Sequence, residues 1–113
     1  MRCAAALVVA SHQYFVRDRF QIIELAAAHR IPAMYEWREQ VADGGLMAYS
    51  TSLFGLYQRI AMYMDRILKG ARPGDLPVER PATFNLVINL KTARSMGLAI
   101  PASFLLRANE VIE

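Results

Sequence analysis

Apolar runs of strand length alternate with helical patterns in the first part of the chain. Ala4–Ala10 is a short apolar run ending at polar residues, so it predicts a strand buried on both faces, as in a parallel sheet. Tyr14–Ala28 carries apolar residues at helical intervals, and Pro32 limits this helix because the residue before a proline resists helical geometry. Pro32–Tyr35 predicts a second strand, which completes a right-handed βαβ unit.

A polar segment and a third short strand follow. Glu36–Ala42 has room for one helical turn, and Gly44–Gly45 breaks it. Two glycines in succession permit a positive φ and a close backbone approach, although an ordinary turn is an equally open interpretation. Leu46–Tyr49 predicts the third strand.

The most regular helical pattern lies in the middle of the chain. Ser52–Lys69 repeats apolar residues at helical intervals and keeps most charges on other faces. Thr51 or Ser52 can cap its start, and Gly70 stands where a left-handed residue commonly ends a helix. We therefore expect one long amphipathic helix here.

The last third of the chain predicts a connector, a strand and two helices. Arg72–Thr83 is rich in proline and glycine and predicts an extended connector. Phe84–Leu90 alternates apolar and polar residues like a strand, and Asn89 can cap a short helix over Leu90–Met96. A proline in the first turn favours a last helix over Pro101–Val111.

Length and charge narrow the classes of function. The chain has 113 residues, is 55% apolar and carries a formal charge of +3. This length corresponds to one domain or less, with enough apolar residues for a core. Basic and acidic residues are interspersed along the chain, which argues against the clustered basic stripe of a nucleic-acid-binding surface.

Residues that carry chemistry are scarce. Cys3 is the one cysteine, so no internal disulfide can form, and His12 and His29 lack the spacing of metal ligands. The sequence has no phosphate-binding glycine motif and no pattern that pairs a nucleophile with a base. Met47, Met62 and Met64 are expected to fill the core. We expect no catalytic residue, no metal and no cofactor.

The N-terminal residues could be mistaken for a signal peptide. They contain one arginine and a short apolar run, but the cleavage site is poor and no spacer follows. The sequence also lacks a stretch approaching the roughly 20 apolar residues that span a bilayer. The chain expressed as it stands is therefore expected in the cytoplasm.

The turn after the first predicted strand is a candidate binding loop. Ligands of open α/β sheets bind beyond the carboxyl ends of the strands. Ser11 and Gln13 offer hydrogen bonds beside His12, and the helix that starts here favours a carboxylate. In the alternative interpretation, Ser11 only caps the helix, and His12 and Gln13 are solvated.

A second candidate cluster follows the second strand. Tyr35 and Trp37 form an aromatic pair that could stack on a ring, and Glu36 between them could pair with an ammonium group. The alternative places Tyr35 in the core and pairs Glu36 with Arg38 at the surface. A ligand that suits both candidate loops is a small zwitterion or amide with an apolar or aromatic part.

Three segments of the sequence resemble one family. HRIPAMYEWRE at 29–39, GGLMAYS at 44–50 and the stretch from ILKGARPG to NEVIE at 67–113 resemble the C-terminal part of the substrate-binding proteins of ABC importers. The branch is the one whose better-known members bind tryptophan or tyrosine, and the resemblance covers nearly the whole chain. It implies an α/β fold of the type I periplasmic-binding-protein class, with a mostly parallel short sheet flanked by helices.

The resemblance also implies how the chain is divided. The whole chain, 1–113, would be one partial domain. Residues 1–45 would form the βαβ portion of one lobe, and 46–113 would supply the returning strand, long helix, connector, strand and C-terminal helices. Tyr49 and Ser50 would lie near the cleft where the chain passes between lobes. His12 stands where the family frequently has aspartate, which changes the ligand groups that this loop favours.

The implied function is solute binding for transport. Family members close two lobes around a small molecule such as an amino acid and deliver it to an ABC permease from the periplasm. An alternative is a truncated module that binds no ligand and self-associates through exposed sheet edges. Because strands that read as buried lack neighbours in so short a chain, we expect a homo-oligomer.

Overall fold

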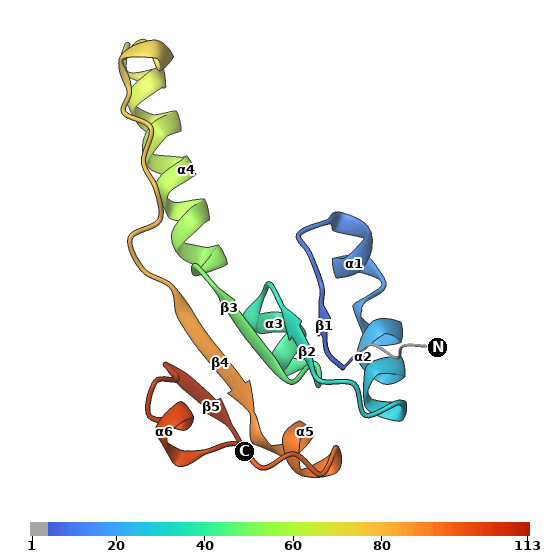
Figure 1. The fold of residues 1–113 in the computed structure, drawn as a ribbon. Coiled ribbons are helices and arrows are strands. Elements are labelled where there is room, and N and C mark those ends of the chain that lie inside the picture. The colour runs from blue at the N-terminus through green and yellow to red at the C-terminus, as the bar shows by residue number, and fades with distance from the viewer. Residues whose placement is uncertain (1–4) are drawn as a thin grey trace. The chain divides into compact units, whose positions relative to one another are not determined.

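The computed structural model describes residues 5–113, which divide into two compact units (Figure 1). The first unit contains the chain up to Ser50 together with Asn85–Glu113, and the second is Thr51–Phe84. The predicted strand Ala4–Ala10 is therefore described only from Ala5 onward, and Cys3 lies outside the described residues.

The first unit is built on one five-stranded sheet with the strands in chain order (Figure 1). Three of its pairings are parallel, and the pairing of the third strand with the fourth is antiparallel. The predicted α/β fold with a mostly parallel short sheet is confirmed. The strands are β1 (Leu7–Val8), β2 (Ala33–Tyr35), β3 (Met47–Ser50), β4 (Asn85–Asn89) and β5 (Glu110–Ile112).

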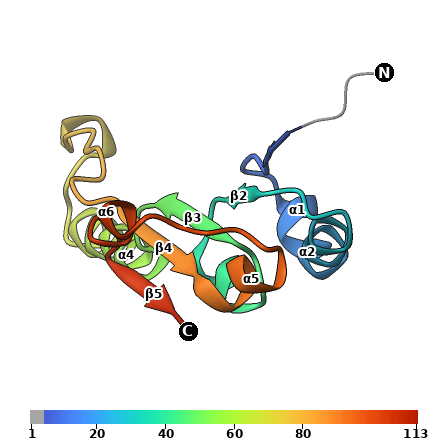
Figure 2. The same cartoon turned by 60° about the horizontal axis from the view of Figure 1, so that its bottom comes forward.

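Short helices flank this sheet. Figures 1 and 2 show the first two helices at the β1–β2 end and the last at the β5 end. The third packs against β2, β3 and β4. The helices of this unit are α1 (Gln13–Arg17), α2 (Arg19–Ala28), α3 (Arg38–Ala42), α5 (Leu90–Ser95) and α6 (Ala102–Leu105).

The core lies where α2 and α3 meet the sheet. Its buried members come from β2, β3, β4, the end of the first strand segment and the two helices. They are Val9, Ile23, Ala26, Ala33, Tyr35, Val41, Ala48 and Val87. Burial of such apolar side chains is the main stabilising term of a small domain.

Burial along two strands differs from the sequence pattern. β4 reads as alternating, yet Leu86–Asn89 is buried throughout because β4 lies inside the sheet, between β3 and β5, and contacts α3. β1 was expected to be buried on both faces, and this was wrong for Leu7 and Val8, of which Val8 is 76% exposed. β1 forms the edge of the sheet, with β2 as its neighbour.

The predicted helix over Tyr14–Ala28 is interrupted. It consists of α1 and α2, and Asp18 lies between them with φ −94° and ψ 19°. Arg19 starts α2 with its guanidinium 2.6 Å from a carboxylate oxygen of Asp43, which follows α3. This long-range ion pair fixes the beginning of α2 relative to α3.

The predicted helix over Pro101–Val111 was wrong beyond its first turn. α6 ends at Leu105, and the chain then forms β5 parallel to β4. Asn109 directs this change, because its amide N–H donates to the Leu86 carbonyl and its side-chain oxygen accepts from the Leu86 N–H at 2.9 Å. Pairing with a strand far away in the sequence overrides the local helical pattern.

The second unit is a long helix with a returning connector. α4 (Leu53–Leu68) begins at the predicted cap, where the Ser52 hydroxyl accepts from the Gly55 N–H, and Gly70 follows it with φ 106°. The connector contains a short 3-10 turn, η1 (Pro73–Asp75). It is held along α4 by the Tyr63 hydroxyl, which donates to the Pro77 carbonyl, and by the Arg59–Glu79 ion pair. Met62 and Met64 are both 57% exposed, so the expectation that they fill the core was wrong.

Candidate functional site

One edge of the sheet collects most of the predicted binding residues. β1, β2 and β3 are parallel, so their carboxyl ends meet at the same edge. The register pairs Tyr35 with Ala48, so Glu36 and Tyr49 follow at the next level. β4 runs the other way and brings its first residue, Asn85, opposite Ser50. The chain thus places the end of each parallel strand at one candidate ligand edge.

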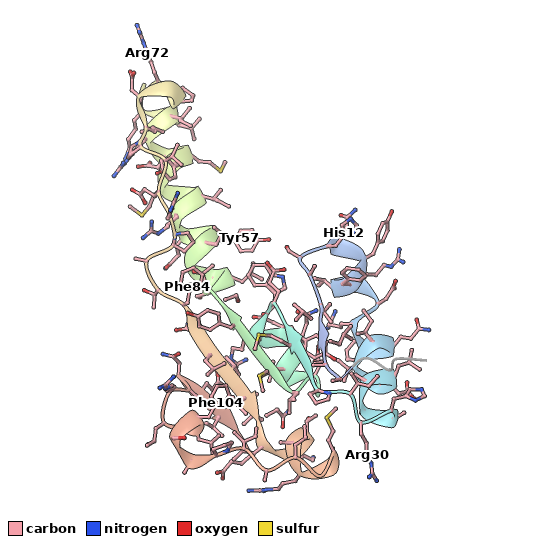
Figure 3. All side chains as sticks on the ribbon, in the orientation of Figure 1. His12, Arg30, Tyr57, Arg72, Phe84 and Phe104 are labelled. Carbon is pink, nitrogen blue, oxygen red and sulfur yellow. The ribbon has the colours of Figure 1, made fainter. Side chains whose placement is uncertain are left out.

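The loop after β1 is organised by His12 rather than by Ser11. The Nδ1 atom of His12 accepts a hydrogen bond from the Tyr14 N–H at 3.2 Å, which caps α1. Its ring lies 4.9 Å from that of Tyr14, between centroids. Figure 3 shows His12 at the turn between β1 and α1. The alternative in which Ser11 is the cap and His12 is only solvated is therefore wrong.

The polar groups of this loop remain exposed. Ser11, His12 and Gln13 all face solvent within the described chain. α1 has five residues, because the helix breaks at Asp18. A helix dipole grows with the number of aligned peptides, so a helix this short gives less support to carboxylate binding than the continuous helix that the sequence predicts.

Tyr35 lies in the core of the unit. Its side chain is 2% exposed, and burial raises the pKa of its hydroxyl. Its ring packs against the backbone at Gly45, where a Cβ atom would come within 2.8 Å of two ring carbons. The structure thus matches the interpretation that puts Tyr35 in the core, and it shows why close approach at Gly45 is needed. Gly44 has a φ of 116°, as a double glycine permits.

Glu36 leaves one carboxylate oxygen without a protein partner. Its Oε2 atom is buried, and no hydrogen-bond partner lies within reach of it in the part of the chain that the structure describes. Glu36 as a whole is half-buried at the end of β2. Buried polar atoms are satisfied in the great majority of cases, so this oxygen at the end of β2 is an exception that needs an explanation.

Arg38 does not pair with Glu36. Its Nε and Nη2 atoms contact the two carboxylate oxygens of Glu110 at 2.6 and 2.5 Å, a bidentate pair between α3 and β5. The hydrogen bonds from Arg38 hold the pKa of the Glu110 carboxyl below its ordinary value. The surface pairing of Glu36 with Arg38, one of the alternatives that the sequence left open, is therefore wrong.

The pair of Arg38 and Glu110 could not be found from the sequence pattern. The two residues are 72 positions apart, and Glu110 lies on β5, a strand for which the sequence pattern predicted a helix. A local signal does exist at the start of α3, where the Gln40 side chain accepts from the Trp37 N–H at 3.0 Å. This bond fixes the first turn of α3 and with it the position of Arg38.

Tyr49 and Ser50 end β3 at the candidate ligand edge. Tyr49 is 56% exposed and Ser50 is half-buried. The boundary between the two compact units falls directly after Ser50. Both residues therefore stand where the chain leaves the sheet.

Two further properties of residues 5–113 bear on function. These residues contain no group of three or more His, Cys, Asp or Glu side chains that could hold a metal ion. The described helices also include none with the length and apolar character to cross a membrane.

Solved structures share this fold. A conserved domain protein from Vibrio cholerae O1 biovar El Tor superposes with a TM-score of 0.90 at 23% identity, over 96% of this chain and 36% of its own. The ABC domain of a Streptococcus pneumoniae protein in complex with L-Trp gives 0.88 at 28% identity, over 96% and 37%. A ligand-free, open substrate-binding protein with adhesive properties from Clostridium difficile gives 0.63 at 18% identity.

The chain corresponds to little more than a third of each of these neighbours. No curated protein matches it significantly. The family of ABC transporter substrate-binding proteins, however, matches residues 2–112, nearly the whole sequence. The sheet and the polar strand ends along one of its edges agree with this match. The chain belongs to the ABC transporter substrate-binding protein family.

Proposed function

We propose that the chain forms one wall of a solute-binding site and that Glu36 binds the ammonium group of a small zwitterion such as an amino acid. The observation that carries the proposal is the buried Oε2 atom of Glu36 at the carboxyl end of β2, for which residues 5–113 supply no hydrogen-bond partner. A buried carboxylate oxygen without a donor is costly, and a ligand ammonium would remove that cost.

The surrounding residues fit the rest of such a ligand. Ser11 and Gln13 present exposed donors on the neighbouring loop, and Tyr49 and Ser50 follow at the end of the next strand. His12 belongs to the same loop through its cap on α1. Tyr35 supports the site from the core, because its buried ring fixes the end of β2 against Gly45. These groups supply hydrogen bonds for a carboxylate and an exposed ring for an apolar part.

The family gives the wider role. Its members are solute-binding proteins rather than enzymes, which act outside the cytoplasmic membrane and serve ABC permeases. The pneumococcal neighbour contains L-Trp, which supports an amino acid as the ligand class. In this role the chain binds, orients and releases a solute, and closure of a two-lobed site would add contacts from the second lobe.

Calorimetry with matched ligands tests the assignment of Glu36. Two forms of the protein would be used. One is the chain alone, and the other is the chain joined to the part of the pneumococcal protein for which it has no counterpart. L-tryptophan has both charged groups, tryptamine lacks the carboxylate and indole-3-propionate lacks the ammonium. We expect Glu36→Gln to weaken the binding of L-tryptophan and of tryptamine about ten- to a hundredfold, which is the effect of losing a charged hydrogen bond. The affinity for indole-3-propionate should not change.

Glu39→Gln is the matched control. Glu39 is an exposed glutamate three positions further on, in α3, and its removal should leave all three affinities unchanged. Equal losses from both variants would contradict a specific role of Glu36. Failure of both forms of the protein to bind any tested amino acid would contradict the proposed function itself.

A further inference from the structure

The charges around Glu36 present a problem of competition. A carboxylate kept for a ligand must not be neutralised by a neighbouring cation of the protein itself. Arg38 is two positions away, and Trp37 between them is extended, with φ −107° and ψ 144°. Residues two apart on an extended segment project to the same side, so Arg38 is the cation best placed to occupy Glu36.

Arg38 is instead turned toward the opposite end of the sheet. Tyr35, Ala48, Val87 and Glu110 form one row across β2, β3, β4 and β5. With neighbouring strands about 4.8 Å apart, Glu110 stands roughly 14 Å along the sheet from the β2 backbone. Arg38 starts α3, which crosses β3 and β4, and its guanidinium meets Glu110 with two parallel contacts.

Resting on the proposed function, we propose that Glu110 is a positioning residue that holds Arg38 away from Glu36 and so keeps the Glu36 carboxylate available for a cationic ligand group. Two independent observations support this role. Glu36 has a buried oxygen for which residues 5–113 supply no donor, and the nearest arginine along the chain has the Nε–Nη2 edge of its guanidinium bound to Glu110. Bidentate geometry matters, because a guanidinium bound at two atoms has little freedom to turn toward a second carboxylate.

The inference predicts opposite effects of two substitutions that break the same ion pair. Glu110→Gln removes the anion and leaves Arg38 charged and free to turn to Glu36. Arg38→Gln removes the competing cation and leaves Glu36 as it was. A purely structural pair would make both variants behave alike, since each loses the same contact between α3 and β5.

The first measurement needs no ligand and uses the chain as it is. The Nε–Hε NMR resonance of Arg38 reports the partner of its guanidinium. We expect Glu36→Gln to leave this resonance unchanged in the wild-type background and to shift it in the Glu110→Gln background. The double variant Glu39→Gln/Glu110→Gln is the control, because Arg38 could pair with its neighbour Glu39 instead of Glu36. If removal of Glu36 has no effect in the Glu110→Gln background, or if removal of Glu39 accounts for the shift, the inference is wrong.

The second measurement is L-tryptophan affinity in the form of the protein that binds it. Glu110→Gln should weaken binding about two- to fivefold, the range that one exposed ion pair provides, and Arg38→Gln should not. The double variant Arg38→Gln/Glu110→Gln should regain the affinity of Arg38→Gln, because the competitor is gone. Equal weakening by both single variants would overturn the inference.

The two proposals fail in different ways. Loss of affinity in Glu110→Gln with no loss in Glu36→Gln would contradict the role of Glu36 and this inference together. Loss of L-tryptophan affinity in Glu36→Gln with no loss of affinity in Glu110→Gln would leave the proposed function intact and contradict only the role of Glu110. The NMR result stands by itself if L-tryptophan is not bound.

Discussion

The ring of Tyr35 lies directly against the backbone of Gly45. A Cβ atom at Gly45 would come within 2.8 Å of the Cδ2 and Cε2 atoms of Tyr35, and equally close to the carbonyl oxygen of Gln40. Such distances are too short for non-bonded atoms, and one of the three groups is backbone. The end of β2, where Glu36 begins, therefore depends on the absence of a side chain at position 45.

Gly45→Ala should destabilise the chain. Overpacking a well-filled site costs about 1–3 kcal/mol, and here the Tyr35 ring and the α3 carbonyl would both have to move. Urea unfolding measures the loss as a lower midpoint at constant slope. Gly74→Ala is the control, because nothing lies within 4 Å of a Cβ at that position. Similar free energies of unfolding for Gly45→Ala and wild type would contradict this packing.

The buried side chain of Asn89 supports a second prediction. Its Nδ2 donates to the Val41 carbonyl at 3.1 Å, and its Oδ1 accepts from the Thr92 N–H at 3.1 Å. Asn89→Ala removes one donor to the Val41 carbonyl, which keeps its bond from the Gly44 N–H at 3.1 Å, and removes the cap of α5, so we expect a loss of about 1–3 kcal/mol.

The strand that ends at Asn89 offers a matched control for this variant. Asn85 begins β4 and is half-buried. Asn85→Ala should cost less than about 1 kcal/mol, because it breaks neither of the two bonds above. The comparison is made by thermal or urea unfolding of both variants, and equal losses would show that Asn89 is not a special position.

Caps of this kind explain which parts of the fold the sequence could predict. Ser52, Gly70 and Asn89 act on backbone groups within a few residues, so local spacing is sufficient to place α4 and α5. β5 could not be placed in this way. Its residues follow a proline that suits a helix, and its strand conformation comes from hydrogen bonds of Asn109 to Leu86, 23 positions earlier.

The candidate site also contains features that local sequence predicts and features that depend on tertiary contacts. Polar residues at strand ends can be read from the sequence, which gives Ser11, Glu36 and Ser50. The burial of Tyr35 and the partner of Arg38 depend on tertiary contacts, with Gly45 and with Glu110. The sequence therefore proposes which strand ends form the candidate site, and the three-dimensional structure shows which of its groups are already engaged by other residues.

The ion pair of Arg38 and Glu110 should make stability depend on pH. Its hydrogen bonds lower the pKa of Glu110 in the folded chain from the ordinary 4.5. The pair thus stabilises the folded chain above that ordinary value, and the contribution is lost as the pH falls through the lowered pKa.

We expect Arg38→Gln to lower the free energy of unfolding by about 0.2–1 kcal/mol at pH 7, the range of exposed pairs. The difference from wild type should shrink as the solution is made more acidic than pH 4.5. Arg107→Gln, at an exposed arginine without an ion pair in the described chain, should show no such trend. A difference that stays constant from neutral to acid pH would be inconsistent with the pair.

The last prediction concerns the apolar face of α4. Leu53, Tyr57, Ile60, Met64 and Ile67 follow one another at alternating intervals of four and three residues, which places them on one stripe of the helix. Tyr57, Ile60, Met64 and Ile67 are exposed in the described chain. Burial of apolar surface stabilises by about 25 cal/mol per Å², so this stripe favours association of the chain as it stands.

Met64 and Met62 provide a matched pair of positions for the test. Both are 57% exposed, but Met64 lies on the stripe, whereas Met62 lies with Arg59, Tyr63, Arg66 and Glu79 in a small pocket beside the connector. Met64→Glu should shift the chain toward monomer in sedimentation velocity at micromolar concentration, because it puts a charge into the associating face. Met62→Glu adds the same charge beside two arginines, away from the stripe, and should leave the distribution unchanged. A wild-type chain that sediments as a compact monomer would show that the stripe does not associate, and equal effects of the two variants would show that charge alone, rather than this face, controls assembly.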